Sequence, residues 1–210
     1  LLGFASYSEY NGEFGGTVDI MYAGIAVAAA VVFQFIYFAI RYKFTMAIAA
    51  FAADLHNLLI FYALLAITRV QVSVSVVALS VLVVLLTMIC CGILFGKMRK
   101  SFRQDSYKAM SSFEQVDAAL REGFKPVTLI NVILASAFVL VLIFSLFAGA
   151  GIYGLFMPCA CGIIAAAACQ YGSLFFMPAV YSRLKLRADN RAAKKASKYS
   201  GAKKAAKVAE

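Results

Sequence analysis

Five long apolar runs, separated by short polar stretches, dominate the pattern of the chain. They are approximately Ile20–Ile40, Met46–Thr68, Val72–Phe95, Val127–Phe147 and Ile152–Tyr181. Each contains about 20 residues or more, which is the length that an α-helix needs to cross a hydrocarbon core of about 30 Å. The pattern therefore predicts an all-α fold, a polytopic membrane bundle with five transmembrane helices.

The connection between the third and fourth runs carries a second pattern, within residues 99–125. Its apolar residues recur at spacings of three to four, at Phe113, Val116, Leu120 and Phe124. Charged residues stand between them, so the segment predicts an amphipathic helix in the cytoplasmic interface of the membrane. Ser111 or Ser112 is expected to cap its start, and Pro126 to mark its end and the first turn of the next span.

Composition excludes a soluble domain. Of the 210 residues, 63% are hydrophobic and 14% are charged, whereas soluble domains average about 45–50% apolar and 25% charged residues. Residues 20–185 are expected to form the transmembrane bundle. The chain begins with Leu, and no basic segment precedes a short apolar stretch. We therefore expect no signal peptide, and an N-terminal part that is missing.

The basic residues orient the predicted bundle. Nineteen of the twenty Lys and Arg residues lie on alternate connections, and Arg69 is the exception. Because basic residues gather in cytoplasmic loops, the side that carries the nineteen is expected to face the cytoplasm. The leader, residues 1–19, carries Glu9, Glu13 and Asp19. It is therefore expected outside, with the C-terminus in the cytoplasm.

Residues 186–210 form a basic tail in which Lys pairs alternate with Ala and Ser. The tail has no apolar face wide enough to pack, so we expect it to be solvated and held near anionic lipids. Each basic residue at such a surface contributes about 1 kcal/mol. The net charge of +10 follows from the topology, so no specific nucleic-acid partner is expected, and an RNA contact stays the weaker alternative.

The cysteines give no indication of a metal or redox site. All five lie inside the third and fifth runs, at Cys90, Cys91, Cys159, Cys161 and Cys169. Adjacent and one-spaced cysteines lack zinc-ligand spacing, and thiols inside helices usually serve as small apolar groups. No nucleophile–base pair or phosphate-binding glycine loop is recognisable. We therefore expect no metal, no cofactor and no enzymatic activity.

The fifth run is rich in Gly and Ala. Small residues let helix backbones approach closely, so we expect this span at the centre of the bundle. Pro158 and Pro178 are expected to bend it or to open it locally.

Ionisable residues inside a membrane span are costly and often mark functional sites. Only the second run holds them, at Asp54 and His56, with Asn57 beside them. Asp54 and Asn57 are three residues apart and share a helix face, whereas His56 points elsewhere. Asp54 could take and release protons in a wet cavity, or it could hold helices together as a hydrogen-bonded group. Both roles stay open.

Three segments carry motifs that are similar to those of a known family. Tyr37–Phe44 is similar to Tyr-Ile-x-x-Arg-Phe, and Ala52–Asn57 is similar to Ala-Ala-Leu-x-His-Asp. Lys97–Arg103 is similar to Asp-Arg-Ile-Arg-Glu-Asn-Phe-Arg.

A fourth motif lies in the fifth run. Its matching positions in the pattern Gly-Ile-Ile…Tyr-Ser-Ser-x-Phe…Pro are Gly162, Tyr171, Ser173 and Pro178. In the order and spacing of all four motifs, the chain resembles the membrane part of SecF. SecF belongs to the SecD/SecF family of the resistance-nodulation-division superfamily.

Several positions depart from the pattern of that family. The family's Asn-Asp-Thr, whose Asp is its proton-linked residue, falls on Ile89–Cys91. Its His-Asp pair reads His56 and Asn57, and Asp54 lies one turn earlier on the same face. The first span and the extracytoplasmic domain of the family are missing, so residues 1–19 would be the end of that domain.

The resemblance implies an accessory subunit of the Sec protein-export machinery in the bacterial cytoplasmic membrane. It would work with a SecD-like subunit beside the Sec channel and its associated translocase, and use the proton gradient to help draw preproteins outward. Asp54 would be the surviving proton site, with His56 and Asn57 as polar neighbours. The residues expected to anchor the cytoplasmic end by charge are Arg41, Lys97, Arg99 and Arg103.

Two other functions stay open. A transporter module of the same superfamily, exporting lipids or small molecules, would need more polar groups along a path than these runs hold. A non-coupling scaffold would stabilise its partner without conducting protons, and the loss of the family's acids favours it.

Overall fold

A computed structural model describes residues 17–68, 74–104, 110–147 and 153–208, so the predicted leader lies outside the described part up to residue 16. The elements are helices α2 (Thr17–Arg41), α3 (Phe44–Ile67), α4 (Val74–Ser101), α6 (Ser112–Phe147), α7 (Tyr153–Tyr171), the π-helical segment η2 (Gly172–Phe176) and α8 (Met177–Val208). The described residues contain no strand, and they hold 5 helical stretches long and apolar enough to cross a membrane. The predicted all-α bundle is confirmed.

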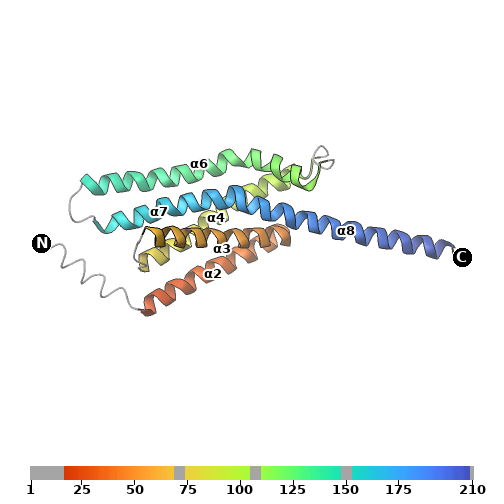
Figure 1. Ribbon diagram of the computed structural model, residues 1–210, viewed down its shortest axis with the longest axis horizontal. Coiled ribbons are helices and arrows are strands. Elements are labelled where there is room, and N and C mark those ends of the chain that lie inside the picture. The colour runs from red at the N-terminus through yellow and green to blue at the C-terminus, as the bar shows by residue number, and fades with distance from the viewer. Residues whose placement is uncertain (1–16, 69–73, 105–109, 148–152, 209–210) are drawn as a thin grey trace.

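The helices run up and down in turn, so that alternate connections lie at the same end (Figure 1). The turn between α2 and α3 and the connection between α4 and α6 lie at the end from which α8 projects. These are the connections that carry the basic residues.

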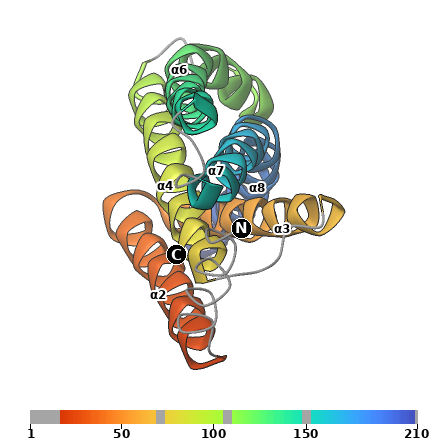
Figure 2. The same ribbon diagram turned by 90° about the vertical axis from the view of Figure 1, so that its left-hand side faces the viewer.

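Helix α4 occupies the middle of the bundle. It packs against α2, α3, α6 and α7. Seen along the bundle, α2 and α6 lie on opposite sides of α4 (Figure 2). The continuous stretch α7–η2–α8 contacts α3, α4 and α6. The fifth run is therefore central as predicted, and it shares that place with α4.

The inner face of α3 shows why this helix lies against its neighbours. Ala47, Ala50, Asp54, Asn57 and Phe61 recur at spacings of three and four, and all are fully buried. The small alanines allow close backbone approach at one end of the helix. Asp54 and Asn57 lie on the same face, so the spacing that buries the alanines also places these two polar residues in the interior.

The amphipathic segment is not a separate helix. It is continuous with the fourth span in α6, and Pro126 lies inside that helix. The prediction that Pro126 ends the segment was therefore wrong. Val116 and Val127 are both buried in the core, so packing stabilises α6 on both sides of the proline at the cost of one backbone hydrogen bond there.

The predicted cap of this helix is present. The Glu114 N–H donates to Ser111 Oγ over 3.4 Å, and the Ser111 N–H donates to Glu114 Oε2 over 2.8 Å. These reciprocal bonds form a capping box, which satisfies two backbone donors that a helix start otherwise leaves without partners. Ser111 is the capping residue.

We expect Ser111→Ala to loosen the first turn of α6, because the Glu114 N–H loses its acceptor. The cost should be about 1 kcal/mol, seen as faster amide hydrogen exchange at residues 113–116. Ser136→Ala is the control, because its hydroxyl donates to the Ile133 carbonyl within an exposed part of the same helix. Equal exchange in the two variants would contradict the capping role.

Helix α8 continues the fifth span well beyond the bundle (Figure 1). Its residues 186–197 are all exposed, as expected for a solvated basic tail. The sequence patterns did not predict that this part of the chain is helical.

Only one of the two prolines of the fifth run lies beside an irregular segment. Pro158 lies inside α7, which continues through it. Pro178 follows η2, and there the Met177 N–H donates to the Gly172 carbonyl, five residues back. Since proline has no N–H, it cannot donate to the Leu174 carbonyl as an α-helix requires. The local opening predicted at Pro178 is thus present as a π-helical segment.

Candidate functional site

Asp54 is the acidic side chain at the centre of the bundle. It is fully buried on α3. Gln34 Nε2, from α2, donates a hydrogen bond of 2.6 Å to Asp54 Oδ2. Asp54 Oδ1 has no hydrogen-bond partner among the described residues. Because a buried carboxylate without full solvation is costly in hydrocarbon, Oδ1 is the atom at which a proton or a water would be bound.

Asn57 lies one turn further along the same face of α3 and is also fully buried. Its Nδ2 donates to Thr87 Oγ1 on α4 over 2.8 Å, and the Thr87 hydroxyl donates to the Val83 carbonyl over 2.8 Å. Cys169 Sγ of α7 lies 3.5 Å from Thr87 Oγ1. Asn57 therefore joins α3 to α4 at the point where α7 meets both.

The π-helical segment lies directly against Asn57. A Cβ atom on Gly172 would overlap the Asn57 amide oxygen, so only glycine allows this approach of the two helices. The next residue, Ser173, is fully buried, and its hydroxyl has no partner among the described groups. Single-turn π segments inside α-helices are frequent at functional sites.

His56 lies on a different face of α3, as the spacing predicts. Its ring stacks on Phe176 of η2, with 3.9 Å between ring centroids and an interplanar angle of 14°. The Tyr171 ring lies 6.0 Å away. Asp54 and Asn57 thus face the core, while His56 contacts the same π-helical segment from another side.

A second set of polar side chains lies where α6 meets α4 and α7. Asn131 Nδ2 donates to Gln170 Oε1 over 2.8 Å, and Gln170 Nε2 donates to Thr128 Oγ1 over 2.8 Å. Asn131 Nδ2 also lies 3.4 Å from Cys90 Sγ on α4. Buried and half-buried polar groups therefore come from α2, α3, α4, α6 and α7. We call this set the polar layer, and its residues are Gln34, Asp54, Asn57, Thr87, Thr128, Asn131 and Gln170.

Gln34 is a member of the polar layer that the sequence analysis did not identify. It is an amide within the apolar run of α2, and only 1% of its surface is exposed. An isolated polar residue in a run that would otherwise face lipid is a signal that could have identified it.

The cysteines are free and buried. Cys90, Cys91 and Cys169 belong to the core, where α4 meets α6 and α7. Among the described residues, no three His, Cys, Asp or Glu side chains are grouped as a metal site requires. The absence of a metal or cofactor remains a prediction.

The four residues of the family-like motif have different surroundings. Gly162 lies under the Phe138 ring of α6, and any added Cβ would press on that ring. Pro178 and Ser173 are buried at η2, whereas Tyr171 is half exposed and stacks on Phe175. Gly162 serves the packing of α7 against α6, the other three residues lie at or beside η2, and the four do not form one site.

The predicted anchoring residues are partly brought together. Arg99 Nη1 of α4 donates to the Arg41 carbonyl at the end of α2 over 3.4 Å. Arg41, Arg99 and Arg103 line one cavity together with Lys43, and Lys97 is not among the residues that line it.

The comparisons with known proteins identify the family. Residues 12–187 match the family model described as "Protein export membrane protein SecD/SecF, C-terminal". No curated protein and no solved structure matches the chain. The matched residues include the complete polar layer and all five membrane-spanning stretches except the end of α8. The chain therefore belongs to the SecD/SecF family of protein-export membrane proteins.

Proposed function

We propose that the chain is a SecF-like accessory subunit of the Sec machinery, which acts with a SecD-like partner to promote preprotein translocation driven by the proton gradient. The family match over residues 12–187 supports a protein-export role. The observation that carries the proton-coupled part is Asp54, a buried carboxyl group with one oxygen held by Gln34 and the other without a partner among the described residues.

Protonation at Asp54 would change the contact between α2 and α3. The charged carboxylate accepts a hydrogen bond from Gln34, whereas a proton on Oδ1 adds a donor that needs its own acceptor. The two protonation states therefore favour different arrangements of neighbouring polar groups. A proton that binds one arrangement better shifts the bundle toward it.

The π-helical segment is the element through which such a shift would spread. It contacts Asn57 at Gly172, and His56 at Phe176. Small changes in α3 near Asp54 would therefore reach α7 and α8 directly. Conversion between π-helical and α-helical hydrogen bonding is a two-state change of the kind that coupling requires.

We assign the basic end of the bundle to the cytoplasm and the N-terminus to the outside, in a bacterial cytoplasmic membrane. The positive-inside rule supports this orientation, because the basic connections and α8 lie at one end. The role we propose is not enzymatic, and the basic tail would remain near anionic lipids.

A non-coupling scaffold is the second candidate. It is favoured by Cys90, which stands where the resemblance places the family's proton-linked Asp. In this role Asp54 and Gln34 would be a structural pair, and the chain would only stabilise its SecD-like partner.

The test is export of a secreted reporter in cells that lack the chain and in cells that carry it with its SecD-like partner. We expect deletion to slow export, and an uncoupler to remove most of the difference between the two strains. Unchanged export after deletion would contradict the export role. A difference that persists in full with the uncoupler would favour the scaffold.

A further inference from the structure

A cavity of about 440 Å³ opens at the basic end of the bundle. It lies between the α2–α3 turn and the end of α4. The residues that line it are Ile40, Arg41, Tyr42, Lys43, Met46, Arg99, Phe102 and Arg103.

Half of these lining residues are cations, and no carboxylate is among them. Like charges brought together in a partly enclosed space repel one another, so such a cluster attracts an anion. Arginine guanidinium groups bind phosphate oxygens through paired N–H donors. The chemistry of the cavity is therefore that of a phosphate site.

The depth of the cavity matches the membrane surface. Arg41 is the last residue of α2, and Arg99 lies in the last turn of α4. Both helices reach this end as long apolar spans, so their final basic residues mark the headgroup level. The cations are therefore placed where lipid phosphates are found.

The other half of the cavity lining is apolar or aromatic. Ile40 is 82% exposed beside the basic residues, on the part of α2 that crosses the membrane. Met46 and Phe102 also line the cavity, and Lys185 of α8 lies 4.2 Å from the centroid of the Phe102 ring. A soluble anion would use only the cations, whereas a phospholipid would use the cations and the apolar wall.

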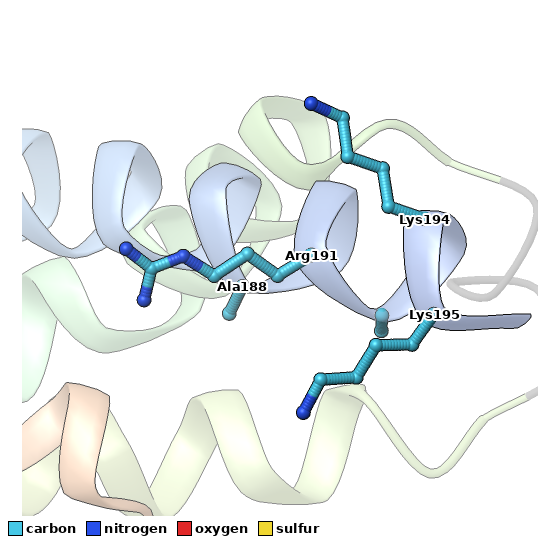
Figure 3. A pocket seen from close by; sticks show the side chains of 5 residues that line it. Ala188, Arg191, Lys194 and Lys195 are labelled. Carbon is cyan, nitrogen blue, oxygen red and sulfur yellow. The ribbon is translucent and has the colours of Figure 1, made fainter. Parts of the chain in front are cut away.

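The basic hollow on α8 lacks these features (Figure 3). It is lined by Ala188, Arg191, Ala192, Lys194 and Lys195, all from one exposed helix. The Lys194 and Lys195 side chains point away from each other (Figure 3). This hollow offers diffuse attraction to an anionic surface and no enclosed site.

We propose that the cavity between the α2–α3 turn and the end of α4 binds one anionic phospholipid. Arg41, Lys43, Arg99 and Arg103 hold its phosphate, and an acyl chain lies along Ile40. This binding is independent of the proton-coupled role of the polar layer, and it is distinct from the attraction of the basic tail to lipid.

The test measures lipid retained by the full chain in native mass spectrometry, after purification in detergent with equal amounts of phosphatidylglycerol and phosphatidylcholine. We expect one phosphatidylglycerol to be retained in preference to phosphatidylcholine. Loss of a charge-assisted contact to a phosphate weakens binding roughly tenfold, so Lys43→Gln with Arg103→Gln should weaken retention about 100-fold. Arg99 is left in place because it also contacts the end of α2.

The matched control is Arg191→Gln with Lys195→Gln, which removes one Arg and one Lys from the hollow on α8. It should leave retention nearly unchanged. An equal loss in both double variants would overturn the proposal in favour of diffuse attraction. Equal retention of both lipids would overturn the proposal, because the site would then not select the headgroup. Displacement of the lipid by millimolar inorganic phosphate would also overturn it, because the cavity would then be a site for a soluble anion. If the double variant unfolds, Arg103→Gln alone should still give about a tenfold loss.

Discussion

Asp54→Asn is expected to abolish the part of preprotein export that depends on the proton gradient. The substitution keeps the shape of the side chain, and the amide oxygen can still accept the hydrogen bond from Gln34. It removes the negative charge and the ability to bind and release a proton, and its NH2 group donates hydrogen bonds as a protonated carboxyl group does. Export of a secreted reporter, measured with and without an uncoupler, should therefore become insensitive to the uncoupler.

The control for this variant is Asp117→Asn. Asp117 is an exposed carboxylate paired with Arg121 at 3.0 Å on α6, and exposed pairs of this kind contribute little to stability. It should leave the gradient response intact. Co-purification with the SecD-like partner shows whether assembly survives in both variants. If Asp54→Asn assembles and keeps a full gradient response, Asp54 is a structural group and the coupling does not depend on it.

Gly172→Ala is expected to lower the stability of the bundle by about 1–3 kcal/mol, the usual cost of overpacking a filled interior. The added Cβ would overlap the Asn57 amide oxygen, so either the Asn57 side chain would leave its hydrogen bond to Thr87 or α3 and the π-helical segment would separate. Thermal unfolding of the protein in detergent should show a lowered midpoint. A loss of stability would be informative, because alanine is the better helix former by about 1 kcal/mol and helix propensity alone predicts a gain.

Two further variants test whether the contact with Asn57 causes this loss. Gly24→Ala on α2 places its Cβ in open space, and it should leave stability unchanged or raise it slightly. Asn57→Ala removes the group that would be overlapped. In a double-mutant cycle, it should therefore recover part of the loss caused by Gly172→Ala. Additive losses would show that the two residues do not restrain each other.

The sequence patterns predicted the fold well because they depend on physical requirements that act locally. A span must be apolar over its full length to cross the hydrocarbon, so five runs predicted five membrane helices. The cap at Ser111 was predictable for the same reason, since a helix start needs acceptors for its first N–H groups. The face shared by Asp54 and Asn57 followed from helical periodicity alone.

Pro126 shows where such local reasoning failed. Proline usually ends a helix, but in α6 the burial of Val116 and Val127 on either side maintains the helix through it. The energy of packing is a property of the folded bundle, so the outcome at Pro126 could not be derived from the proline itself.

The sequence by itself determined that this protein is a polytopic membrane bundle of one family, with its basic residues at one end and an acidic group in its second span. Only the tertiary structure decided which groups meet. It paired Asp54 with Gln34, brought Gly172 against Asn57, and gathered four cations from the α2–α3 turn and the end of α4 around one cavity. These contacts join helices that are distant in sequence. They depend on how each helix rotates and packs against its neighbours, which no pattern within a single helix specifies.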